Sequence, residues 1–122
     1  MIIQESAENY LERILMIKNE KGVVRSIDIA EALHVSKPSV SVAMKKLGEH
    51  GYITMDRDNH IFLTEKGQEV AEAMYERHKL FTDWLISLGV DEKIAHEDAC
   101  KIEHVLSEES FEAFKKKAQE DL

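Results

Sequence analysis

The spacing of hydrophobic side chains predicts three helices in the first fifty residues. ESAENYLERILMIKNEKG (5–22) repeats apolar residues at helical intervals and stops at Gly22, and SIDIAEALHVS (26–36) is a shorter amphipathic segment. The residues expected to face inward in this shorter helix are Ile27, Ile29, Ala30 and Leu33. Ser36 can cap a third helix, KPSVSVAMKKLGEHG, because a serine side chain accepts from the first free amides and Pro38 is tolerated in the first turn.

The next segment changes from helical to β periodicity. In YITMDRDNHIFLT (52–64), two short β-favourable runs flank Arg57-Asp58-Asn59, which predicts a hairpin with a polar tip. The predicted elements follow the order of a winged helix-turn-helix: helix, short helix, turn, helix and hairpin. The second helix of the helix-turn-helix, here the one after Ser36, lies in the major groove of DNA in such motifs.

Three more helices are predicted in the second half of the chain from their capping residues. They run from Thr64 to about Leu88, from Asp91 to about Leu106, and from Ser107 through EESFEAFKKKAQEDL. Gly89 ends the first of them. The expected fold is therefore mainly α, with a winged helix-turn-helix domain at 1–70 followed by a second, α-helical domain at 71–122.

The composition argues against a secreted or membrane-spanning protein. A single cysteine cannot form an internal disulfide, the N-terminus has no signal-peptide pattern, and no stretch approaches the roughly 20 apolar residues of a membrane span. A cytoplasmic protein without a membrane partner is expected. Four aromatic residues exceed what one small core needs, which favours a homodimer; they are Phe81, Trp84, Phe111 and Phe114.

The net charge of −8 argues against DNA binding, but its distribution does not. Residues 21–50 hold five basic and three acidic side chains, so the predicted helix-turn-helix is locally basic within an acidic chain. Four basic residues are expected to contact phosphates: Lys37, Lys45, Lys46 and Arg57. An ordinary solvated helix face is the alternative, and the complete order of elements favours DNA binding.

The stretch HEDACKIEHVL contains the only cysteine. At about 100° per residue, Cys100, Glu103 and His104 share one helix face, and His96 lies one turn earlier. Thiol, carboxylate and imidazole together favour a metal site. Three alternatives stay open: a small core residue, a redox switch, and a nucleophile or hydrolase centre. An enzyme is not expected, because the sequence shows no orienting group or oxyanion hole to accompany a Cys–His pair.

These residues lie in motifs that resemble the iron- and manganese-dependent repressor family, typified by the diphtheria toxin and manganese transport repressors. The motifs are SAENYLERI, DIAEALHVSKPSVSVAMKKL, RHKLFTDWLISLGVDE and HEDACKIEHVLS, and the resemblance covers essentially the whole chain. Longer members append an SH3-like domain, so a chain ending at Leu122 corresponds to a short form.

The resemblance implies that 71–122 is an α-helical dimerisation and metal-binding domain, and that there are two metal sites. The primary site comprises Cys100, Glu103 and His104, joined from the first helix by Asn9, with Glu12 one turn on; the second-site ligands are His78 and His96. Cys100 matches the iron type. Asn9 replaces the methionine or aspartate of known types, and Thr82 stands where the iron type has glutamate.

The resemblance also implies the function. The expected protein is a metal-dependent repressor that binds operator DNA as a dimer when loaded with Fe(II), with Mn(II) as the alternative metal. A metal joining the two domains would set the spacing between the two DNA-binding helices. Base edges would meet Ser36, Pro38, Ser39 and Val42. A winged-helix regulator that senses oxidation or a small ligand through Cys100 is the remaining alternative.

Overall fold

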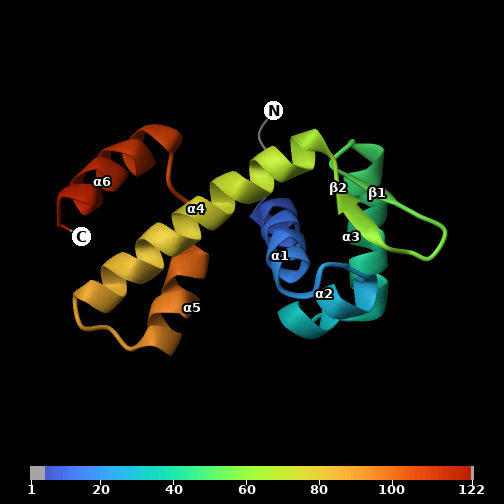
Figure 1. Ribbon diagram of the computed structural model, residues 1–122, viewed down its shortest axis with the longest axis horizontal. Coiled ribbons are helices and arrows are strands. Elements are labelled where there is room, and N and C mark those ends of the chain that lie inside the picture. Colours follow the sequence, from blue (N-terminus) through green and yellow to red (C-terminus); the bar gives the residue numbers. More distant parts are fainter. Residues whose placement is uncertain (1–4, 122) are drawn as a thin grey trace. The chain divides into compact units, whose positions relative to one another are not determined.

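The computed structural model describes residues 5–121, and within them the chain is mainly helical with one hairpin (Figure 1). The elements are α1 (Glu5–Lys21), α2 (Ser26–Leu33), α3 (Lys37–Glu49), β1 (Ile53–Met55), β2 (Ile61–Leu63), α4 (Glu65–Ser87), α5 (Glu92–Ile102) and α6 (Glu108–Asp121). The predicted mainly α fold, with a winged helix-turn-helix at its N-terminal end, is confirmed.

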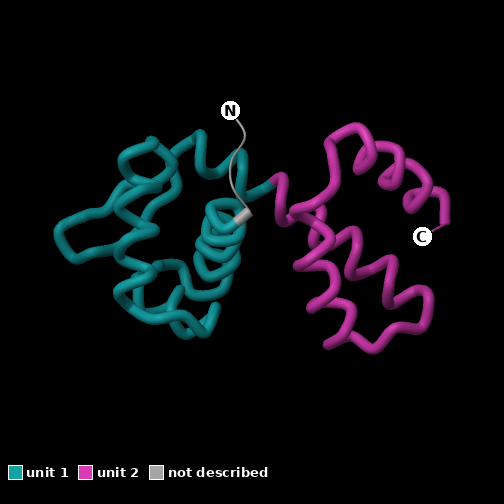
Figure 2. Tube along the Cα trace, turned by 180° about the vertical axis from the view of Figure 1, so that it is seen from behind, with its two compact units in different colours: residues 1–72 teal, residues 73–122 magenta. Residues whose placement is uncertain are grey.

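The chain divides into two compact units, residues 1–72 and 73–122 (Figure 2). Helix α4 begins in the first unit and continues into the second. Each unit has buried apolar side chains of its own. No helix among residues 5–121 is both long enough and apolar enough to cross a bilayer.

In the first unit, local capping defines the helix-turn-helix. His34 adopts a left-handed conformation with φ of 55° and ends α2, two residues before the predicted end. The Ser36 hydroxyl then accepts from the amide of Ser39 at 3.2 Å, as predicted for an N-cap. One inward assignment was wrong in degree: Ile27 is 37% exposed, because the short α2 buries chiefly Ile29 and Ala30.

The hairpin forms the predicted wing. Strands β1 and β2 pair antiparallel, with Ile53 opposite Leu63. The wing is also attached to the segment between α1 and α2, because the amide of Ile61 donates to the carbonyl of Val24 at 2.8 Å. This link leaves the two strands held to the helical part of the unit rather than projecting freely.

The start of α4 packs tightly against the hairpin. The Thr64 hydroxyl donates to the carbonyl of Gly51 at 2.6 Å and accepts from the amide of Gly67 at 3.2 Å. A Cβ atom at Gly67 would lie 2.0 Å from the carbonyl oxygen of Tyr52. Only glycine therefore permits this close approach of helix and backbone.

In the second unit, Gly89 terminates α4 as predicted, and Ser87 is the last helical residue. Gly89 has φ of 95°, the amide of Val90 donates to Leu85, and that of Gly89 donates to Ile86, which is the Schellman arrangement. Predicted caps also begin the next two helices. The Asp91 carboxylate accepts from Lys93 at 3.1 Å, and the Ser107 hydroxyl accepts from Ser110 at 3.1 Å.

The core of the second unit corrects one expectation. Phe81 is 3% exposed and packs with Ala99 and Phe111, and its ring centroid lies 4.9 Å from that of Phe114. These aromatic residues were expected to lie outward and to exceed what one core needs. Phe81 and Phe111 are instead buried, and Phe114 packs against them as a partly buried side chain. Trp84 is also partly buried and meets the Phe114 ring edge-on. Large side chains thus fill the space between the helices of this unit.

Candidate metal centre and DNA interface

Three donors come together at the C-terminal end of α5. The Sγ of Cys100, a carboxylate oxygen of Glu103 and an imidazole nitrogen of His104 lie within 4.8 Å of one another. Glu103 is fully buried, whereas Cys100 and His104 are partly buried. A completely buried carboxylate needs compensating charge and hydrogen bonds, which makes this a site rather than a solvated cluster.

The helix that carries these donors is shorter than predicted. Helix α5 ends at Ile102 and not near Leu106, so Glu103 and His104 belong to the turn that follows. Glu103 keeps a helical backbone, with φ of −58°, and its amide still donates to the carbonyl of Ala99. Because this conformation prolongs the helical direction by one residue, the expected proximity to Cys100 survives the earlier helix end.

Two histidines extend the cluster within the second unit. The Nδ1 of His78, on α4, donates to Oε2 of Glu103 at 2.9 Å, and the Nε2 of His104 lies 3.3 Å from Oε1. On its other side, the Nε2 of His78 is 3.1 Å from the Nδ1 of His96, and the two rings stack. The contact with Glu103 requires a proton on Nδ1 of His78, because a carboxylate oxygen only accepts.

Within the second unit, the structure brings together five predicted metal-binding residues: His78, His96, Cys100, Glu103 and His104. Asn9 and Glu12, which belong to the same predicted set, lie one turn apart on α1 in the first unit. Thiolate, carboxylate and imidazole fit a first-row divalent metal. Thr82, which stands where the iron type has glutamate, lies one turn after His78. Its buried hydroxyl has no hydrogen-bond partner among the described residues.

All eight predicted DNA-contacting residues are exposed in the first unit; they are Ser36, Lys37, Pro38, Ser39, Val42, Lys45, Lys46 and Arg57. All except Ser36 and Arg57 lie on α3, where Val42 is 56% exposed, a high fraction for an apolar side chain on a helix. Such a face, apolar in the middle and basic beyond it, suits base contacts flanked by phosphate contacts.

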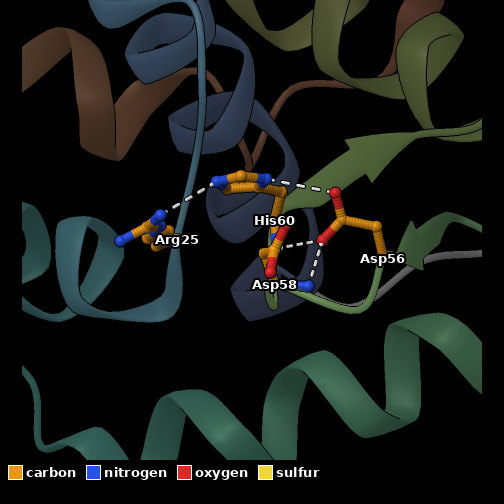
Figure 3. Close-up of polar contacts among 4 residues, drawn as sticks. All are labelled: Arg25, Asp56, Asp58 and His60. Atoms are coloured by element: carbon orange, nitrogen blue, oxygen red, sulfur yellow. Dashed lines mark hydrogen bonds and ion pairs between the residues drawn. The ribbon is translucent and has the colours of Figure 1, made fainter.

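The wing tip is organised by Asp56, which the sequence analysis did not single out. Its Oδ1 accepts from the amides of Asp58 and His60, both at 2.9 Å, and its Oδ2 accepts from the His60 ring at 3.1 Å (Figure 3). The other nitrogen of that ring, Nε2, accepts from Nη2 of Arg25 at 3.1 Å (Figure 3). Arg57 is presented between these residues on the exposed turn.

These hydrogen bonds favour the charged form of the Asp56 carboxyl and occupy its oxygens. The hydrogen bond from the His60 amide is the main cause that lowers the pKa of the Asp56 carboxyl. Asp56, Asp58 and His60 also offer donors within 4.8 Å of one another. Because the Asp56 oxygens already accept from the turn, we interpret this group as structural support for the wing.

Sequence reasoning also missed Arg77, whose side chain reaches the turn after α5. It stands directly before His78 in RHKLF, and nothing in its spacing indicates a partner 26 residues away. The only available signal was its place inside a motif already associated with the metal site.

The fold and these sites together define a class: winged helix-turn-helix proteins with a thiol, carboxylate and imidazole site in a second helical unit. Family models agree. The N-terminal DNA-binding domain of the iron-dependent repressors matches residues 3–61, and their metal-binding and dimerisation domain matches 64–120. The chain belongs to the iron-dependent repressor family.

Individual relatives point the same way. The chain is 40% identical over 115 residues to an uncharacterised HTH-type transcriptional regulator of Methanocaldococcus jannaschii, covering 93% of this chain and 92% of that one. It is 38% identical over 112 residues to the transcriptional regulator MntR of Escherichia coli, covering 92% and 72%. These relatives are transcriptional regulators and not enzymes, in agreement with the sequence analysis.

Solved structures share the fold but are longer. The manganese regulator SloR superposes with a TM-score of 0.79 at 31% identity, covering 95% of this chain and 54% of its own. A manganese-dependent transcriptional repressor in complex with manganese gives 0.83 at 29% identity, covering 93% and 52%. The chain therefore spans about half the length of these proteins.

Proposed function

We propose that this chain is a cytoplasmic transcriptional repressor that binds operator DNA as a homodimer when loaded with Fe(II). The observation that carries the proposal is the convergence of Cys100, Glu103 and His104 donors within 4.8 Å. The same chain places an exposed, partly basic helix in a helix-turn-helix. Metal sensing and DNA binding are the two activities that this pair of features supports.

The donor set supports Fe(II) as the activating metal. A thiolate at position 100 is a softer ligand than the carboxylate of a glutamate would be. It therefore disfavours Mn(II), which prefers hard oxygen ligands among the first-row divalent metals. Mn(II) is the second candidate, because several relatives are named for manganese. Zinc, cobalt and nickel bind such ligands more tightly than Fe(II), so availability in the cell selects the metal.

Within the second unit, the chain's own residues prepare this site. Cys100, Glu103 and His104 would hold the metal, and the resemblance adds Asn9 and Glu12. His78 and His96 are proposed for a second position. His78 orients the Glu103 carboxylate by a 2.9 Å hydrogen bond. A bound metal supplies positive charge that lowers the repulsion between an acidic chain and DNA phosphates.

On the DNA side, we assign phosphate contacts to Lys37, Lys45, Lys46 and Arg57. Base edges or thymine methyl groups would meet Ser36, Pro38, Ser39 and Val42. The exposed Val42 side chain is suited to a thymine methyl, and the Ser36 cap fixes the helix end that approaches the bases.

The test is operator binding measured against a panel of metals. A DNA site is first selected from a random pool by the metal-loaded protein. Affinity for it is then titrated with Fe(II) without oxygen, with Mn(II), and with no metal. Metal should strengthen binding by about tenfold or more. Glu103→Gln should abolish this gain, whereas Glu97→Gln, which changes an exposed carboxylate on α5, should retain it. Tight binding without metal that is lost on oxidation would instead support sensing through Cys100.

A further inference from the structure

Arg77 holds the turn that carries two of the proposed metal ligands. Its Nη1 donates to the carbonyl of Glu103 at 3.1 Å and to the carbonyl of Leu106 at 2.8 Å. The last carbonyls of a helix have no partner within the helix, and α5 ends at Ile102. A side chain of α4 therefore satisfies the backbone where α5 stops.

The guanidinium group is itself fixed in place. It lies over the ring of Phe111, with its central carbon 4.9 Å from the ring centroid. Phe111 is buried in the core of the second unit with Phe81 and Ala99. A guanidinium group that lies over a buried ring loses little further freedom when it donates, which favours one position of the turn.

Consecutive residues of α4 therefore hold Glu103 at two points. Arg77 binds its backbone carbonyl, and His78 binds its carboxylate at 2.9 Å. The amide of Glu103 donates to Ala99 in α5. Groups of the chain itself therefore hold both the backbone and the side chain of Glu103, and they also direct His104, the next residue.

We propose that Arg77 is a positioning residue for the metal centre: it preorganises the turn at 103–106 without contributing a ligand. The inference rests on the proposed metal site. Supporting groups around metal ligands typically change metal affinity by about 10- to 100-fold when removed. Lysine is a poor replacement, because an ammonium group keeps the charge but lacks the planar fork of donors that Arg77 presents.

The experiment measures Co(II) binding to the full chain without DNA. Co(II) serves as the probe because its thiolate and ligand-field absorption bands report both the Cys100 bond and the geometry of the site. Arg77→Gln should weaken Co(II) binding by about 10- to 100-fold and shift the bands, and Arg77→Lys should fall between it and the wild type. Lys79→Gln, which removes the same charge from an exposed position on α4, should match the wild type.

Loss of stability must be separated from loss of positioning. Ala118→Gly weakens α6 at a buried position away from the turn, and urea unfolding of the metal-free proteins compares it with Arg77→Gln. Equal loss of Co(II) affinity in both variants would overturn the inference, as would wild-type affinity and spectrum in Arg77→Gln. Failure of the wild-type chain itself to bind Co(II), Fe(II) or Mn(II) would instead overturn the proposed function.

Discussion

At the scale of single residues, Cys100 distinguishes the two candidate metals. Cys100→Glu replaces a soft donor with a hard one and recreates the glutamate of the manganese-type members. Activation of operator binding should shift towards Mn(II), although Asn9 still differs from their aspartate and limits the gain. Titration of operator binding with Fe(II) and with Mn(II) measures the shift. Cys100→Ala should lose the Fe(II) response and keep its fold; an unchanged response to both metals would show that the thiol is not a ligand.

Asp56 is the residue whose ionisation supports the wing. The amide of His60, followed by the His60 ring and the Asp58 amide, favours the charged carboxylate and lowers its pKa in the folded state. The stabilisation is therefore complete above the pKa of the unfolded chain and is lost as pH falls through the lower folded-state pKa. Urea unfolding should show Asp56→Asn less stable than wild type at neutral pH, with the difference disappearing in strong acid. A loss of stability in Asp56→Asn that is the same at neutral and at strongly acidic pH would contradict this role of the carboxylate.

At the scale of elements, two glycines test how helices are placed. Gly67→Ala should destabilise the protein by about 1–3 kcal/mol, because its Cβ would meet the Tyr52 carbonyl at 2.0 Å. Gly48→Ala, in α3 with nothing within 4 Å of the added carbon, should stabilise it by up to about 1 kcal/mol. Denaturant midpoints compare the two. The same sign for both substitutions would contradict the close approach of α4 to the hairpin.

Helix α3 is the element expected to lie in the major groove. Lys46→Ala should weaken binding to all DNA sequences and lower the slope of log affinity against log salt by about one unit, because one fewer counterion is released. Lys116→Ala, an exposed lysine on α6, is the matched control and should leave the slope unchanged. If Lys37, Lys45, Lys46 and Arg57 can each be replaced without affecting the slope, this face is not the DNA interface.

At the scale of the whole molecule, the prediction is a homodimer. With Phe81 and Phe111 buried, the apolar surface of the second unit comes from other exposed residues: Ile86, Leu88, Ile94 and Val105. The family model matching residues 64–120 describes a dimerisation domain. Sedimentation at micromolar concentration with metal present should give a dimer, and Leu88→Glu or Ile94→Glu should weaken it. Val23→Glu, an exposed apolar position in the first unit, should not. A wild-type monomer would contradict the prediction.

The sequence by itself determined the order of the elements and most of their ends. Ser36, Asp91 and Ser107 cap helices where the pattern predicts, and Gly89 ends α4. These features are local, because a cap needs only a side chain and an amide two or three residues apart. The clustering of Cys100, Glu103 and His104 followed from helical spacing for the same reason.

Tertiary structure alone decided which distant groups meet. Helix α5 stops at Ile102 where Arg77, from another helix, binds the carbonyls of the following turn. Arg25 supports the wing through His60, 35 residues away. Periodicity shows which face of a helix is apolar but not which element covers it. Partner choice depends on the volumes and directions of side chains from several elements at once, and that information exists only when the chain is folded.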